Sequence, residues 1–148
     1  MFNVKLLIIM MILIPGNVYA SEFTGNPGAN MKIIKIIESS NNDQAIGDKG
    51  KALGGYQLHF CVIQDYNKAH GTAYLHTMAF RPQEAGRVAS WYINSEIPRL
   101  IAHYGLKDTL ENRLTAWNMG ISNLRKGKIA KSYIVKYKKL RGIYAKTI

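Results

Sequence analysis

The stretch MKIIKIIESS, residues 31–40, decides the fold of this chain. Its isoleucines at positions 33, 34 and 37 share one side of a helix, so the pattern predicts a short buried helix from Met31 to Glu38. The following residues, 39–55, are rich in Gly, Asn and Asp, which interrupt regular structure. That segment has room for a β-turn or a small hairpin. Glu38 therefore stands where an apolar helix runs into a glycine-rich turn.

Hydrophobic spacing beyond the turn predicts further helices. The first of these runs from Leu58 to about Ala69. The next begins at Pro82, a residue suited to a first helical position, is kinked at Pro98 and ends at Gly105.

The C-terminal part of the chain predicts two more helices. Asp108, with Glu111 three residues later, is typical of a capping box, and Gly120 is expected to end that helix. The last helix carries lysines on one side and an apolar stripe on the other. The stripe consists of Ile129, Tyr133, Tyr137 and Leu140. The expected fold class is α+β, predominantly α, in a single domain.

The first twenty residues have the features of a cleavable export signal. Lys5 precedes an apolar stretch, residues 6–15, which Pro15 ends before the small residues at the expected cleavage point, Ala20. Cleavage there would leave one domain, residues 21–148, in the periplasm or outside the cell. A buried core helix and an uncleaved membrane anchor are the alternatives. The single cysteine, Cys61, cannot form an internal disulfide, and we expect it to be buried.

The positive charge of the chain is concentrated at its C-terminal end. The 148 residues carry 20 Lys and Arg against 9 Asp and Glu, a net charge of +11. No acidic residue follows Glu111, whereas basic residues are dense from position 125 to 141. We expect this region to attract anionic polymers of the cell envelope, and the alternative is a solvated face that keeps the protein soluble.

Glu38 is the residue whose position suggests chemistry. Burial against apolar neighbours disfavours its charged form and raises its pKa, as a general acid near neutral pH requires. The alternative is a solvated carboxylate that only ends a helix. Ser39, beside it, either hydrogen-bonds near a cleft or satisfies the helix end.

Four ordered motifs resemble the soluble lytic transglycosylase domain of the lysozyme-like superfamily. Glu38-Ser39 is similar to the family's Glu-Ser at the end of its first catalytic-domain helix, and residues 54–57 are similar to its Gly-x-x-Gln turn. Residues 116–120 (AWNMG) resemble Ala-Tyr-Asn-x-Gly, and Tyr133 is placed like the late Tyr that reaches back toward the catalytic Glu. The chain departs from the family in having Tyr at position 56, where Met is common, and Trp at position 117, where Tyr is commoner.

The resemblance implies a lysozyme-like fold, with a small β element beside a cleft, and a muramidase activity. The substrate would be the β-1,4 bond between N-acetylmuramic acid and N-acetylglucosamine in peptidoglycan, with Glu38 as general acid and then base. We expect a lytic transglycosylase, in which the sugar's own 6-hydroxyl is the nucleophile and 1,6-anhydro ends form. A hydrolytic lysozyme would use water, normally with a second carboxylate, for which Asp43 and Asp48 are candidates. A catalytically inactive, cationic envelope-binding module is the third possibility.

The supporting site residues each have two interpretations. Gln57 and Asn118 carry amides that suit the hydroxyl and N-acetyl groups of a sugar, or that tie loop backbone together. Tyr56 and Trp117 either stack on sugar rings or fill the core, and the core is favoured for Trp117. Tyr133 either orients the catalytic acid or belongs to the core.

Several other functions lack their sequence signals. The four His and one Cys show no metal-ligand spacing, so no metal and no cofactor are expected. Residues 45–52 lack the opening Gly and the Ser/Thr of a phosphate-binding loop, and no Gly-x-Ser-x-Gly motif occurs. We expect a monomer that binds peptidoglycan strands and no nucleic acid, and the sequence leaves open whether it works with a secretion or conjugation apparatus.

Overall fold

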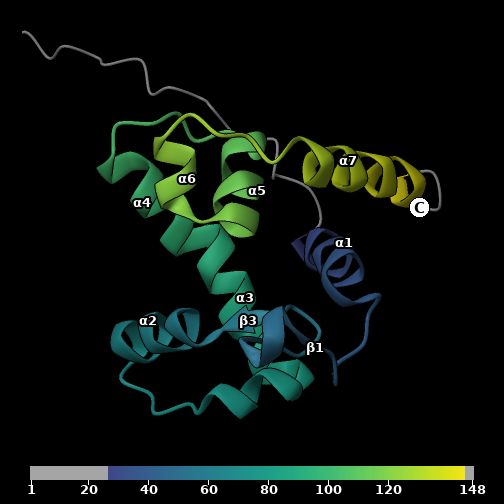
Figure 1. Ribbon diagram of the computed structural model, residues 1–148, viewed down its shortest axis with the longest axis vertical. Helices are drawn as coiled ribbons and strands as arrows, with labels where there is room; N and C mark the ends of the chain where they lie inside the picture. The colour runs from purple at the N-terminus through teal and green to yellow at the C-terminus, as the bar shows by residue number, and fades with distance from the viewer. Residues whose placement is uncertain (1–26, 146–148) are drawn as a thin grey trace, which may run out of the picture.

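The structure, a computed structural model, describes residues 27–145, so the expected export signal lies outside the described residues. It is mostly helical with one small antiparallel sheet (Figure 1), which confirms the predominantly α, α+β class. The α-helices are α1 (Pro27–Ser39), α2 (Phe60–His70), α3 (Pro82–Trp91), α4 (Ile97–His103), α5 (Leu110–Met119), α6 (Ile121–Arg125) and α7 (Lys131–Ala145). The remaining elements are β1 (Ile46–Gly47), η1 (Asp48–Gly50), β2 (Ala52–Leu53), β3 (Leu58–His59), η2 (His76–Phe80) and the π-helical turn η3 (Tyr92–Glu96).

The glycine-rich segment after α1 forms the three-stranded sheet, in the order β1-β2-β3. Ile46 pairs with Leu53, and Leu53 pairs in turn with Leu58, so two tight turns connect the strands. The second turn contains Gly54 at φ +75°, and a Cβ there would lie 1.8 Å from the carbonyl oxygen of Ala79. Only glycine fits this position, which fixes the turn against η2.

Three of the predicted helices have different limits in the structure. Helix α1 begins at Pro27, before the expected Met31. The segment expected to be helical from Leu58 starts with strand β3, and α2 begins at Phe60. Thr109, and not Asp108, caps α5, because its hydroxyl accepts a hydrogen bond from the backbone N–H of Asn112 at 3.1 Å. The prediction of a capping box formed by Asp108 and Glu111 was therefore wrong. Asp108 instead forms a bidentate ion pair with Arg113, at 2.6 Å for both contacts.

The last helix and the cysteine also differ from expectation. Helix α7 begins at Lys131, so Ile129 precedes it and is 40% exposed instead of joining the apolar stripe. Cys61 is exposed, because it lies in the first turn of α2, on the side away from the core. The two predictions were wrong for different reasons: Cys61 is helical but faces away from the core, whereas Ile129 lies before the first residue of its helix.

Just before Pro98, where a kink is expected, the structure has an irregular helical turn. Pro98 has no N–H to donate to the carbonyl four residues before it, and the preceding turn, η3, adopts π-helical geometry between α3 and α4. The helix ends as predicted near Gly105, which has φ +65°.

The core joins helices from both ends of the chain. In Figure 1, α7 lies beside α1, while α2, α3 and the sheet occupy the opposite end of the molecule. None of the described helices is long and apolar enough to cross a membrane. The largest fully buried side chains are Tyr137, Ile33, Ile34, Leu58, Ile63, Ile93, Ile97, Ile101, Leu110, Leu114, Val88 and Thr115.

Two buried hydrogen bonds fix the position of α7. The hydroxyl of Tyr137 donates to Oδ1 of Asn30 on α1 at 2.8 Å. The backbone N–H of Ala130, just before α7, donates to Oγ1 of Thr115 on α5 at 3.1 Å. Because a buried polar atom without a partner is costly, these bonds favour one placement of the helix between α1 and α5.

We predict that Gly54→Ala destabilises the protein by about 3 kcal/mol or more, because the new Cβ meets backbone and the left-handed conformation is unfavourable. Gly71→Ala is the matched control: Gly71 has φ +64° with open space around its Cβ position, and its loss should be about 1–2 kcal/mol. Urea denaturation measures both. Equal losses would show that the contact with Ala79 is unimportant.

Candidate active site

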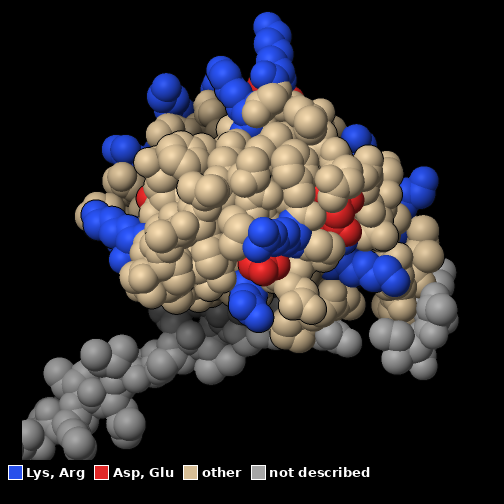
Figure 2. All heavy atoms as spheres, turned by 90° about the horizontal axis from the view of Figure 1, so that it is seen from below, with Lys and Arg blue, Asp and Glu red and all other residues tan. Residues whose placement is uncertain are grey.

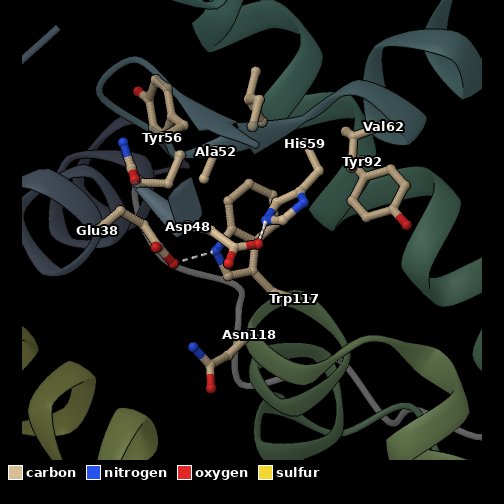
Figure 3. Close-up of a pocket in the computed structure, with 11 residues that line it drawn as sticks. Glu38, Asp48, Ala52, Tyr56, His59, Val62, Tyr92, Trp117 and Asn118 are labelled. Carbon is tan, nitrogen blue, oxygen red and sulfur yellow. Dashed lines mark hydrogen bonds and ion pairs between the residues drawn. The ribbon is translucent and has the colours of Figure 1, made fainter. Parts of the chain in front are cut away.

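A pocket of about 230 Å³ opens between the sheet and the helices (Figure 3). Its walls come from α1, η1, β2, β3 and the turn that joins them, α2, η3 and α5. The lining residues are Glu38, Asp48, Ala52, Tyr56, Gln57, Leu58, His59, Val62, Tyr92, Trp117 and Asn118. Segments separated by 80 residues of chain therefore meet around Glu38.

Glu38 lies in the last turn of α1 and is held by two hydrogen bonds to one oxygen. The indole Nε1 of Trp117 and the hydroxyl of Tyr133 both donate to Oε1 at 2.7 Å. Figure 3 shows the bond from Trp117. None of the described residues hydrogen-bonds the other oxygen, Oε2, and this atom is not sealed from solvent. The carboxyl group is thus fixed through one oxygen and offers the other to the pocket.

Burial raises the pKa of Glu38 above its ordinary value. The hydrogen bonds from Tyr133 and Trp117 oppose this shift, as does the charge of His59, but desolvation is the largest effect. The pKa of Tyr133 is itself raised, first by burial and then by the neighbouring Glu38 charge, so its hydroxyl remains a proton donor. Glu38 can therefore hold a proton at a pH where an exposed glutamate has lost it.

The two carboxylates proposed as a second catalytic group are in different environments. Asp43 lies 2.8 Å from Nζ of Lys35, in an ion pair, and it does not line the pocket. Asp48 lines the pocket, and its Oδ2 lies 3.7 Å from Nε2 of His59 (Figure 3). The structure brings Asp48, and not Asp43, into the same cavity as Glu38.

The backbone of the β1–β2 turn explains how Asp48 reaches the pocket. Asp48 and Lys49 have φ values of +46° and +54°, in the left-handed region that residues with a Cβ seldom adopt. Two such residues in succession reverse the chain tightly between Gly47 and Lys51. Asp tolerates this conformation better than most residues, and strained backbone of this kind is common at functional sites.

The predicted amides differ in their freedom to bind a ligand. Nε2 of Gln57 donates to the carbonyl oxygens of Gly54 at 2.8 Å and Ala45 at 3.4 Å, so this side chain ties the turn together. The amide of Asn118 is exposed and makes no hydrogen bond to any described residue. Asn118 is therefore the better candidate for binding a ligand.

Ser39 and Tyr56 have structural roles in the described chain. The hydroxyl of Ser39 donates to the carbonyl oxygen of Gly55 at 2.8 Å and accepts from the N–H of Asn42 at 3.0 Å, away from the pocket lining. Tyr56 is 8% exposed and forms part of the pocket wall. Trp117, expected mainly as a core residue, contacts the core but also lines the pocket and binds Glu38.

Sequence analysis missed His59, Val62 and Tyr92 as lining residues. His59 was considered only as a metal ligand, and no spacing marks a residue on β3 as facing α1. Val62 and Tyr92 fall at ordinary helical positions, so only packing shows that their side chains border a cavity. Among the described residues no group of three His, Cys, Asp or Glu could hold a metal ion.

Comparisons with protein-family models, with curated proteins and with solved structures find no match to this chain.

The raised pKa of Glu38 predicts how stability depends on pH. The folded protein holds this proton more tightly than the unfolded chain, so the free energy of unfolding falls as pH rises from the ordinary pKa, 4.5, through the folded value. In Glu38→Gln the side chain does not titrate, so this fall in the free energy of unfolding disappears. The amide oxygen of the glutamine can still accept both hydrogen bonds. Relative to the parent, the variant should therefore become more stable between pH 4 and pH 8 in urea denaturation.

Glu111→Gln provides a control of opposite sign. A hydrogen bond from Lys138 lowers the pKa of Glu111, so this carboxylate stabilises the folded state above its ordinary pKa. That variant should lose stability relative to the parent as pH rises over the same range. A Glu38→Gln difference that is constant with pH would contradict the assigned environment of Glu38.

Proposed function

We propose that this protein is a peptidoglycan-cleaving muramidase with a lysozyme-like fold, and that it acts as a lytic transglycosylase. The observation that carries the proposal is Glu38: a desolvated carboxyl group, fixed at Oε1 and open to a pocket at Oε2. A glycosidase general acid needs this combination of a raised pKa and a directed proton. The substrate, the β-1,4 bond between N-acetylmuramic acid and N-acetylglucosamine, is inferred from the resemblance of the four ordered motifs to the lytic transglycosylase family.

In the first step the proton on Oε2 of Glu38 passes to the glycosidic oxygen as the bond from that oxygen to C1 of N-acetylmuramic acid breaks. The N-acetyl group of the substrate stabilises the oxocarbenium-like centre at C1. The carboxylate that Glu38 becomes keeps its hydrogen bonds from Trp117 and Tyr133, which favour the charged form.

In the second step the same carboxylate accepts the proton of the sugar's 6-hydroxyl while that oxygen bonds to C1. The product is a 1,6-anhydro end, and Glu38 is protonated again for the next cycle. One carboxyl group is enough for this sequence. The exposed amide of Asn118 borders the pocket and is suited to hold a hydroxyl or N-acetyl group of the glycan.

Hydrolysis of the same bond is the second candidate, and the position of Asp48 favours it. A lysozyme places a second carboxylate in the cavity with its acid, and Asp48 lines the pocket of Glu38. Here the nucleophile would be water, and the product a reducing end. The nearby His59 ring, 3.7 Å from Asp48, would hold that carboxylate in place.

The proposed site of action is outside the cytosol, after removal of the export signal near Ala20. The described elements lie between Pro27 and Ala145, so a chain that begins at Ser21 contains all of them. This is the form to test.

We predict that the chain from Ser21 releases muropeptides from purified peptidoglycan, and that Glu38→Gln lowers the rate at least about 100-fold, the lower range for loss of a general acid. Mass analysis of the products identifies the reaction. Products one water lighter than reducing muropeptides indicate the transglycosylase. No release by the parent chain would contradict the proposal and favour an inactive, envelope-binding module.

Asp48→Asn separates the two candidate reactions. If the reaction is transglycosylation, this variant should still form anhydro products at a rate within about tenfold of the parent. If water is the nucleophile and Asp48 assists it, reducing ends should be lost along with most activity.

The pH profile tests how Glu38 is positioned. Tyr133→Phe removes a hydrogen bond that lowers the pKa of Glu38, so the alkaline limb of the activity profile should move to higher pH. Trp117→Phe should move it in the same direction by less, since the Tyr133 bond has the greater effect on this pKa. Reduced activity with an unmoved alkaline limb would show that Tyr133 acts only in packing.

A further inference from the structure

The outward side of α7 is a compact surface of lysines and aliphatic side chains. We define the outer face of α7 as Lys131, Val135, Lys136, Lys139 and Ile143, which share one side of a helix with 3.6 residues per turn. Val135 is 65% exposed and Ile143 is 54% exposed. Single exposed aliphatic residues are ordinary on protein surfaces, and Ile46 and Leu75 are at least as exposed elsewhere, but on this face the two aliphatic side chains lie among positive charges.

The lysines of this face have no compensating charge. Two other basic residues of the C-terminal region have partners: Lys138 pairs with Glu111 at 2.6 Å, and Arg125 lies over the ring of Tyr104 at 4.0 Å. Lys131, Lys136 and Lys139 form no ion pair with any described residue. No acidic residue follows Glu111 in the sequence. The outer face therefore presents an unopposed positive potential.

The opposite end of the molecule has a different surface. Figure 2 looks onto the end where α2 and η2 lie, where most of the surface is neither basic nor acidic and where basic and acidic side chains lie close together within the face. Charges of both signs therefore occur at this end, whereas the outer face of α7 has lysines and no acidic residue.

The inner face of α7 shows that the outer face is available while the pocket is in use. Tyr133 and Tyr137 are buried, and the Tyr133 hydroxyl binds Glu38. None of the outer-face residues lines the pocket, and Lys131 and Val135 lie about 160° from Tyr133 around the helix. A partner on the outer face would therefore leave the pocket uncovered.

We propose that the outer face of α7 docks the protein on the surface of an anionic phospholipid bilayer. Lys131, Lys136 and Lys139 would contact lipid phosphates, while Val135 and Ile143 enter the boundary between headgroups and acyl chains. A soluble polyanion satisfies the lysines but offers no apolar phase for the two aliphatic side chains. The combination on one helical face is what favours a bilayer over a dissolved polymer.

Vesicle co-sedimentation of the chain from Ser21 tests this inference. We expect binding to vesicles of phosphatidylglycerol and phosphatidylcholine that weakens with salt, and no binding to phosphatidylcholine alone. The triple variant Lys131→Gln, Lys136→Gln, Lys139→Gln should bind on the order of 100-fold more weakly, at about fivefold per lysine. The matched triple Lys51→Gln, Lys68→Gln, Lys107→Gln removes the same charge from exposed positions elsewhere and should bind nearly as the parent does.

The aliphatic residues decide between the bilayer and a dissolved polyanion. Val135→Ser with Ile143→Ser keeps every charge and should bind anionic vesicles about tenfold more weakly or worse, with unchanged helical circular dichroism. Unchanged vesicle binding by this variant would overturn the proposal, as would equal losses from the two lysine triples.

Docking on a membrane does not require catalysis, so an experiment that refutes one of the two proposals leaves the other intact. Glu38→Gln should bind vesicles as the parent does whether or not the parent cleaves peptidoglycan. Vesicle binding that depends on Glu38 would contradict the assignment of docking to the outer face of α7.

Discussion

Oε1 of Glu38 accepts two hydrogen bonds from donors 79 and 95 residues away in the chain. These bonds require the end of α1, the end of α5 and the inner face of α7 to meet at Glu38, on one side of the pocket. They also set the chemistry of the carboxyl group. Removal from water opposes ionisation of Glu38, while the two donors favour its charged form. Because desolvation is the larger effect, the pKa of Glu38 is raised. The two donors are nevertheless in place to stabilise the carboxylate when it forms.

The placement of α7 links this site to the outside of the molecule. The helix is fixed by the bond from Tyr137 to Asn30 and by the bond from Ala130 to Thr115, and none of these four residues lines the pocket. Such anchors allow Tyr133 to reach Glu38 with defined geometry. The same rigidity holds the lysines of the outer face in one array, since a helix packed on one side has little freedom to rotate. One helix therefore positions the acid and presents the charged surface.

The glycine-rich turn limits what chemistry the pocket can support. Left-handed backbone at Asp48 and the contact of Gly54 with Ala79 hold the small sheet against η2, and this arrangement puts Asp48 beside His59 in the pocket. Asp43, five residues earlier, is neutralised by Lys35 instead. The difference between the two acids lies in the local path of the chain, and it decides which carboxylate could assist a water molecule.

The sequence by itself determined the helical class, the buried α1, the small β element in residues 39–55 and the prominence of Glu38 and Tyr133, because periodicity and turn residues act over a few positions. It misjudged Cys61, Asp108 and Ile129, since spacing alone shows neither which helical positions face the core nor at which residue a helix begins. Tertiary structure alone decided the pairing of Trp117 with Glu38, the entry of His59 and Tyr92 into the pocket, and the choice of Asp48 over Asp43. Those outcomes depend on contacts between residues far apart in the chain, and the energies that fix them come from burial and hydrogen bonding between packed elements.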